Sequence, residues 1–184
     1  MNKEVFILKK VNLRKLCFAA IMAALFVVIE LLSLDIGSQI KITFDGLPIL
    51  ISSFVLGPVW GGIVGFTGSF ISQLINYGLS FSTFLWVLPA VIRGILAGII
   101  FNAFKKNINF LSVGTTVIST SLIVTVLNTL IMIFESIVLG YYSYTFLSAA
   151  TAFRFVSSVI TAVAYMLVIT PLLKITAKQI KHYF

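Results

Sequence analysis

The chain has 184 residues, of which 60% are hydrophobic and 10% are charged, and its formal net charge is +8. Globular domains carry about 25% charged residues, so the composition excludes an ordinary water-soluble domain and favours an all-α integral membrane protein. The single Cys17 and single His182 exclude a disulfide framework within the chain, a cysteine-based metal site and Ser–His or Cys–His catalysis. We therefore expect no enzyme, no metal and no cofactor bound by the chain itself.

The positive charge is concentrated in three short groups beside apolar segments, which argues against nucleic acid as a partner. The groups lie within 1–15, at 105–106 and within 174–181. Lys and Arg collect on the cytoplasmic side of membrane helices. This distribution predicts that both termini are cytoplasmic and that the basic side chains touch anionic membrane lipids. The basic start runs into a segment long enough to stay as a span, so we expect no cleaved signal peptide.

Apolar runs of about 20 residues can cross a membrane, and they predict a six-transmembrane-helix bundle in a single membrane domain, 1–184. An even number of spans returns the C-terminus to the side of the N-terminus, in agreement with the basic groups. The second predicted helix is too short to span comfortably. The predicted helices cover 13–34, 47–56, 59–77, 83–104, 110–139 and 148–175.

The first helix carries two interleaved pairs of small residues, Ala19/Ala23 and Ala20/Ala24. Such pairs let another helix approach closely, and two interpretations remain open: packing within the bundle, or a docking face for another subunit. A polar outer loop follows at 35–46, where the alternation of IKITF indicates an extended piece. The third predicted helix has three glycines at a spacing that suits close packing: Gly61, Gly65 and Gly68.

A single charged residue, Arg93, interrupts the apolar sequence between Gly46 and Phe104. It lies in the middle of the helix predicted over 83–104, where an unpaired charge costs at least about 2.5–3.5 kcal/mol. Charges at such a depth normally face the bundle interior or a wet cavity. Arg93 therefore marks the interior of the predicted bundle.

Seven charged residues remain when the cytoplasmic ones are set aside, and all fall in the outer loops or the outer half of the membrane. One interpretation is structural pairing of Arg93 with Glu30 or Glu135. The other is a polar cavity that opens outward, because arginines beside aromatic rings suit a planar anionic ligand. The seven residues are Glu30, Asp35, Lys41, Asp45, Arg93, Glu135 and Arg154.

Aromatic and amide side chains near the outer helix ends complete the candidate ligand site. These candidate residues are Trp86, Phe153, Phe84, Tyr77 and Asn76.

No GxxxxGK[ST] motif occurs, which argues against an ATPase that works alone.

These motifs, in this order, resemble the substrate-binding S components of the energy-coupling factor (ECF) vitamin transporters, and most of all the folate branch. The likeness covers nearly all the chain and is most specific over 40–70, which reads IKITFDGLPILISSFVLGPVWGGIVGFTGSF. The later PAVIRGILAGII, with its Arg-Gly step, supports it. Relatives often carry Asp after the glycines of the helix predicted over 59–77, at the position where this chain has Ser69.

The resemblance implies a six-helix fold with an outward vitamin pocket under the first outer loop, in a bacterial cell membrane. It also implies a complex with a transmembrane coupling subunit and two cytoplasmic ATPases, which use the ATP. The coupling subunit would dock on the small-residue face of the first helix, which is Ala19, Ala20, Ala23 and Ala24.

Folate or a related pterin is the expected ligand, because it combines a flat ring, a benzoate bridge and two carboxylates. We expect Arg93 and Arg154 to contact the pterin or the carboxylates. Lys41 would neutralise the glutamate tail near the loop.

Four further side chains have expected roles at this site. Trp86 and Phe153 would stack on the ligand, whereas Glu30 or Glu135 would accept hydrogen bonds from pterin N–H groups or balance the arginines. Thiamine is the alternative vitamin, although its positive charge fits the arginines less well. A membrane scaffold, whose charges only lock helices together, is the alternative outside transport.

Overall fold

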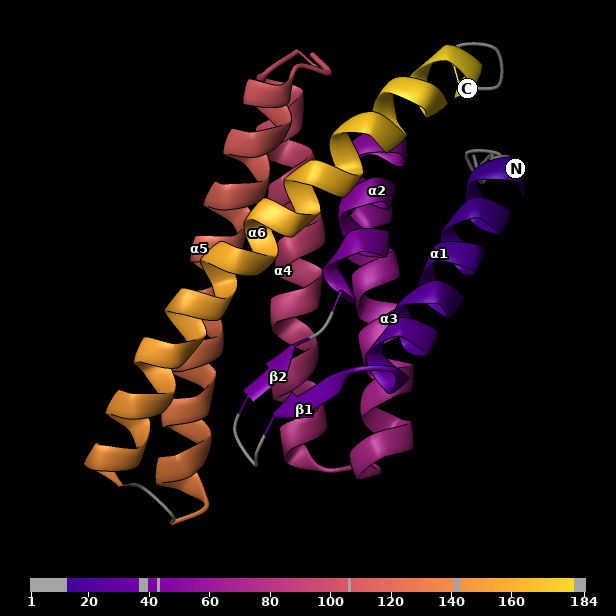
Figure 1. Cartoon of the computed structure of the whole chain (residues 1–184). Coiled ribbons are helices and arrows are strands. Elements are labelled where there is room, and N and C mark those ends of the chain that lie inside the picture. The colour runs from indigo at the N-terminus through magenta and orange to yellow at the C-terminus, as the bar shows by residue number, and fades with distance from the viewer. Residues whose placement is uncertain (1–12, 37–39, 43, 106, 141–142, 181–184) are drawn as a thin grey trace, which may run out of the picture.

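The computed structural model describes residues 13–36, 40–42, 44–105, 107–140 and 143–180. This part of the chain folds into six α-helices and one short β-hairpin, so the predicted all-helical architecture is confirmed (Figure 1). The predicted basic start at 1–12 lies outside the described residues. The helices are α1 (Leu13–Leu31), α2 (Gly46–Leu56), α3 (Pro58–Tyr77), α4 (Phe81–Ala103), α5 (Phe110–Val138) and α6 (Tyr144–Ile180).

An antiparallel hairpin connects α1 to α2, in the segment predicted as a loop with an extended piece. Strand β1 (Leu34–Ile36) pairs with β2 (Ile40–Ile42), and Asp35 lies opposite Lys41 in the register. Figure 1 places the hairpin toward the end of the bundle where α3 joins α4, away from the end where α1 begins and α6 ends.

The helix ends have identifiable causes in the sequence. Gly57 ends α2 with a φ of 99°, which glycine adopts without strain, and Pro58 begins α3, where a missing N–H costs no helical bond. Gly78 ends α3 with a φ of 70°. Ser80 and Thr83 then form a reciprocal capping box at the start of α4. The predicted break at Gly57-Pro58 is confirmed.

Glycines let the backbones of α3 and α4 approach closely along a shared seam. A Cβ atom added at Gly94 would collide with the carbonyl of Gly61, and one added at Gly65 would collide with the carbonyl of Ala90. The Ser53 hydroxyl on α2 joins this seam by donating to the Gly94 carbonyl at 2.8 Å. Close backbone approach is what stabilises helix pairs in lipid, so the packing role predicted for these glycines of α3 is confirmed.

Two buried clusters form the core. One joins α2, α4, α5 and α6 and includes Phe54 and Phe101, whose ring centroids are 4.6 Å apart. The other joins α1, α2, α3 and α4 and includes Ala19, Ala23 and Phe26. Because α2 and α4 contribute to both clusters, they form the centre of the bundle.

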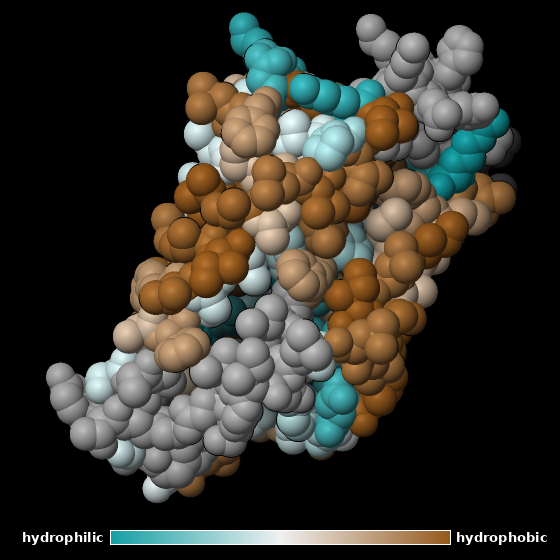
Figure 2. Space-filling model, in the orientation of Figure 1, coloured by the Kyte–Doolittle hydropathy of each residue, from teal (hydrophilic) through white to brown (hydrophobic). Residues whose placement is uncertain are grey.

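Three described helices are long and apolar enough to cross a membrane, judged by length and composition: Phe81–Ala103, Phe110–Val138 and Thr151–Ile175. Figure 2 shows hydrophobic side chains over much of one face and hydrophilic ones gathered at the end where α6 finishes. The start of α1 and the end of α6 lie at that same end (Figure 1). The count of six spans and the cytoplasmic position of the termini remain predictions.

Candidate functional site

The candidate site lies between α4 and α6, where two groups of polar side chains are held at different depths. On α4, Trp86 and Arg93 are seven residues apart, so they share one face and lie about 10 Å apart along the axis. On α6, Arg154 and Tyr165 are eleven residues apart and also share a face. The outer group contains Trp86 and Arg154, and the inner group contains Arg93 and Tyr165.

The outer group joins an aromatic ring, a cation and a carboxylate from three helices. The Arg154 guanidinium lies 5.5 Å from the centroid of the Trp86 ring. The Trp86 indole N–H donates to Glu135 Oε2 on α5 at 3.0 Å, and Arg154 Nη1 donates to the Asn128 carbonyl at 3.5 Å. Glu135 is only 8% exposed, so its charge depends on these neighbours for stabilisation.

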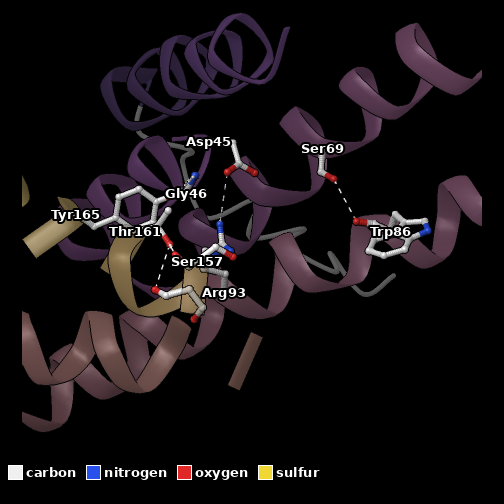
Figure 3. Close-up of polar contacts among 9 residues, drawn as sticks. Asp45, Gly46, Ser69, Trp86, Arg93, Ser157, Thr161 and Tyr165 are labelled. Carbon is white, nitrogen blue, oxygen red and sulfur yellow. Dashed lines mark hydrogen bonds and ion pairs between the residues drawn. The ribbon is translucent and has the colours of Figure 1, made fainter. Parts of the chain in front are cut away.

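Ser69, which stands where the resemblance in the sequence leads us to expect Asp, contacts this outer group from α3. Its hydroxyl donates to the Trp86 carbonyl at 3.5 Å, as Figure 3 shows. The side chain thus fixes the backbone of α4 beside the candidate ligand site. It supplies no negative charge there, in contrast to an aspartate.

The inner group ties the junction between hairpin and α2 to the two long helices (Figure 3). Asp45 Oδ1 lies 3.8 Å from Arg93 Nη1, with the two side chains 19% and 18% exposed. The Gly46 N–H donates to the Tyr165 hydroxyl at 3.3 Å, and Phe44 packs edge-on against the Tyr165 ring. A Cβ atom at Gly46 would meet both Arg93 and Tyr165 within 3 Å, so a larger residue at this point would require these side chains to shift.

Two fully buried polar atoms of the described residues have no hydrogen-bond partner, and both belong to this region. They are Arg93 Nε and Ser158 Oγ. Buried polar atoms are paired in the great majority of cases. Their position on α4 and α6 therefore indicates hydrogen-bonding capacity that the described part of the chain does not use.

The structure divides the predicted site residues. Arg93, Arg154, Trp86 and Glu135 are brought together in the two groups described above. The predicted structural partner of Arg93 was Glu30 or Glu135; Glu135 accepts from Trp86, and Asp45 is a carboxylate that lies beside Arg93. The reason is the hairpin, which returns the chain to the middle of α4.

Four other predicted contacts lie away from these groups. Tyr77, Phe84 and Phe153 are each more than half exposed. Phe84 packs on Phe70 at a centroid distance of 6.0 Å, and the exposed Asn76 donates to the Ser72 carbonyl of its own helix. These side chains point toward the surface because the turn of each helix rotates them away from Trp86 and Arg93.

Glu30 and Lys41 belong to the neighbourhood of the hairpin. Glu30, half-buried near the end of α1, acts electrostatically on Tyr165 together with Asp45. The backbone of Lys41 lies in β2, whereas its side chain is outside the described part of the structure. The contact predicted between Lys41 and a ligand tail remains a prediction.

The alanines of α1 point in two directions. Ala19 and Ala23 are 4% and 6% exposed and pack in the core, whereas Ala20 and Ala24 are exposed. Ala19, Ala20 and Ala23 also line a shallow apolar groove of about 150 Å³ against Trp60 and its neighbours on α3. The interpretation as internal packing therefore holds for one pair, and the other pair is available at the surface. The lone Cys17 is exposed on the same helix.

Sequence reasoning missed Tyr165, Gly46 and Ser158 as members of the site. Tyr165 and Ser158 had one available signal, since both recur at helical spacing from Arg154 on an otherwise apolar helix. Asp45 appeared only as one of several outer charges. Its pairing with Arg93 depends on the path of the hairpin, which no short pattern in the sequence specifies.

Apolar helices that enclose arginines, a carboxylate and buried hydroxyls are typical of membrane proteins that handle polar solutes. The family model described as "ECF transporter, substrate-specific component" matches residues 14–177, so the chain belongs to this family. It is a substrate-specific S component of an ECF transporter, as the resemblance in the sequence implied.

Solved structures show the same fold. A structure of ThiT from Listeria monocytogenes aligns with a TM-score of 0.72 and 19% identity, covering 91% of this chain and 97% of that one. The S component of a bacterial ECF transporter aligns with a TM-score of 0.61 and 16% identity, covering 89% and 97%. At these identities the likeness concerns the fold alone. No curated protein sequence matches the chain.

Proposed function

We propose that this S component binds folate or a related pterin from outside the cell and delivers it inward. The observation that carries the proposal is the Arg154 guanidinium held over the Trp86 ring, 5.5 Å from its centroid, among apolar helices. A guanidinium on an aromatic plane keeps N–H groups for a carboxylate, while aromatic rings nearby stack on a flat ligand. Folate has both a flat ring system and carboxylates.

Arg93 supplies a second cation, on the face of α4 that carries Trp86. Its Nε–H is buried without an acceptor among the described residues, and Asp45 approaches Nη1 only to 3.8 Å. A ligand that reaches between the two arginines would supply the missing acceptor. Lys41 keeps its proposed role beside the glutamate tail of folate, which would extend toward the hairpin.

As a substrate-specific component of an ECF transporter, the chain associates with an energy-coupling module. The proposed module has one transmembrane coupling subunit and two cytoplasmic ATPases, which would hydrolyse the ATP. Ala20 and Ala24 form the proposed docking face, because they are the exposed pair on α1. Ala19 and Ala23 would support this face from beneath.

Thiamine is the second candidate, and the buried Glu135 beside Trp86 is the observation that favours it. A carboxylate next to an aromatic ring suits a cationic ligand. Two arginines on the same side of the bundle oppose that assignment, since they would repel the ligand. Family membership supports substrate binding over the scaffold interpretation.

Tryptophan fluorescence tests the proposed function, because Trp60 and Trp86 are the only two tryptophans. Purified protein titrated with folate should show saturable quenching. Trp86→Phe should remove most of this quenching. Trp60→Phe is the matched control, because Trp60 lies on α3 beside the α1 groove, and it should retain the quenching. Mass spectrometry of co-purified small molecules gives an independent identification.

Two results would contradict the proposal. Quenching by thiamine but not by folate would identify thiamine, rather than folate, as the ligand. Loss of the folate signal in Trp60→Phe, with full signal in Trp86→Phe, would place the ligand away from the Trp86–Arg154 pair.

A further inference from the structure

The hydroxyl of Ser158 differs from the other fully buried hydroxyls of the described residues, because it has no partner. Ser158 is only 9% exposed and its Oγ is shielded from solvent. By comparison, Thr120 on α5 and Thr170 on α6 donate to the carbonyls four residues earlier, at 2.6 and 2.7 Å. Such bonds to the preceding turn are the usual solution for hydroxyls in apolar helices.

The usual acceptor for Ser158 is already occupied. Four residues earlier lies the Arg154 carbonyl, which accepts the Ser157 hydroxyl at 3.1 Å and is also the helical acceptor for the Ser158 N–H. A carbonyl oxygen has two lone pairs, so these two donors exhaust it. Ser157 thereby leaves the neighbouring hydroxyl of Ser158 free for another partner.

Ser158 also lies on the face of α6 that points to the candidate site. Residues 154, 158 and 165 recur at helical spacing and share one face. Arg154 reaches Trp86 on α4 and Tyr165 reaches Gly46 at the start of α2, so this face is turned toward α4 and α2. Ser158 is about 6 Å further along α6 than Arg154, between the outer and inner groups.

The surroundings agree with a ligand at this level. Arg93 carries the second unpartnered buried atom, Nε, and lies beside Tyr165 of this face of α6, because a Cβ atom at Gly46 would meet both side chains within 3 Å. Figure 2 shows a hollow with a hydrophilic floor beside α6 on this face of the molecule. Two unpartnered polar groups from two helices therefore border one region.

We infer that Ser158 is a specificity-determining residue, whose hydroxyl hydrogen-bonds the polar edge of the ring of the bound vitamin. This inference rests on the proposed function, since it needs a vitamin between α4 and α6. The ring would lie between the Trp86–Arg154 pair and Arg93. A heteroaromatic ring with nitrogen or carbonyl groups on its edge provides the partner that the helix does not.

Isothermal titration of wild type and three variants tests the inference, with folate and thiamine as the probes. Ser158→Ala should weaken binding of whichever vitamin the wild type takes by about two- to tenfold, the range expected for one hydrogen bond. Ser158→Cys, nearly the same size but a weak donor, should fall in between. Thr170→Ala is the matched control, because the Thr170 hydroxyl donates to the Met166 carbonyl of the same helix, and it should bind within about twofold of the wild type.

The melting temperature of each variant without ligand separates binding from folding. Ser158→Ala should melt no lower than the wild type, because it removes a buried hydroxyl that has no partner. Equal affinity in Ser158→Ala and wild type would overturn the inference and leave the proposed function intact. Binding of neither vitamin by the wild type would overturn both.

Discussion

The two arginines inside the bundle have different surroundings, which indicate different roles. Arg154 rests on an aromatic ring and bonds a backbone carbonyl, whereas Arg93 faces the Asp45 carboxylate. A buried charge that loses its partner is costly, because the remaining charge stays away from water. Each arginine is therefore part of the fold as well as a candidate ligand contact, and mutations must distinguish the two roles.

Arg93→Ala should weaken folate binding by about 2–5 kcal/mol if Arg93 pairs with a buried ligand anion. Arg93→Lys should restore only part of the affinity, because the planar fork of the guanidinium is lost. Calorimetric titration measures both. Normal affinity combined with a lowered melting temperature in Arg93→Ala would assign the residue to structural pairing with Asp45 instead.

Glu135→Gln tests whether Glu135 contacts the ligand or only balances the charge of Arg154. The glutamine oxygen can still accept the Trp86 indole N–H, but the negative charge beside Arg154 is removed. Folate affinity should stay within about tenfold of the wild type, roughly 1.4 kcal/mol, because the arginine is then fully available to a carboxylate. Competition binding gives the measurement; a larger loss would mean that Glu135 contacts the pterin directly.

Among the helices, α3 and α4 share the closest backbone contact described in the core. Gly94→Ala should lower the melting temperature, because its Cβ would collide with the Gly61 carbonyl. Overpacking of this kind costs about 1–3 kcal/mol. Ala103→Leu is the control, since Ala103 is exposed on the same helix. Equal melting temperatures for the two variants would show that the seam adapts without cost.

Helix α1 presents two alanine pairs that should respond differently to substitution. Ala20→Leu should leave folate affinity within about tenfold and abolish co-purification with the coupling subunit, because Ala20 is exposed. If all four alanines formed the docking face, as the resemblance implies, Ala23→Trp would behave in the same way. Since Ala23 is only 6% exposed, it should now destabilise the chain itself. Intact coupling in Ala20→Leu would exclude this face as the docking surface.

The elements followed from the sequence more readily than their contacts did. Apolar runs bounded by Gly57-Pro58 and by Gly78 predict helices because these residues end a helix by local backbone geometry. The contact between Gly46 and Tyr165 joins segments 119 residues apart. It depends on how α6 is rotated about its axis, and an apolar helix with polar residues on few positions gives little information about rotation. For the same reason Phe153 was assigned to the site and Ser158 was not.

At the scale of the whole molecule, the helix ends that carry the described basic residues of the predicted cytoplasmic groups gather at one end of the bundle. The start of α1, the junction between α4 and α5 and the end of α6 lie there, opposite the hairpin (Figure 1). In the sequence these segments carry Arg14, Lys105 and Lys174. Such an arrangement predicts that this end is cytoplasmic. The inner and outer groups of the candidate site then lie toward the outside, in agreement with capture of an external vitamin.

Cysteine labelling of intact cells tests this orientation in a chain whose Cys17 has been replaced by Ser. A cysteine at Ser80 or Ser143 should react with an impermeant thiol reagent added outside. A cysteine at Asn107 should react only after the membrane is permeabilised. Labelling of a cysteine at position 107 in intact cells would show that the orientation is the reverse of the predicted one.

The native thiol offers a way to observe assembly without altering the bundle. Cys17 is the single cysteine, it is exposed, and it shares a face of α1 with Ala20 and Ala24. A nitroxide spin label attached there would tumble freely while the protein is alone in a bilayer. Arrival of a coupling subunit on the alanine pair would restrict the label, so that its paramagnetic resonance spectrum broadens. Spectra recorded with and without vitamin would then show whether a filled binding site changes how long the two proteins stay together.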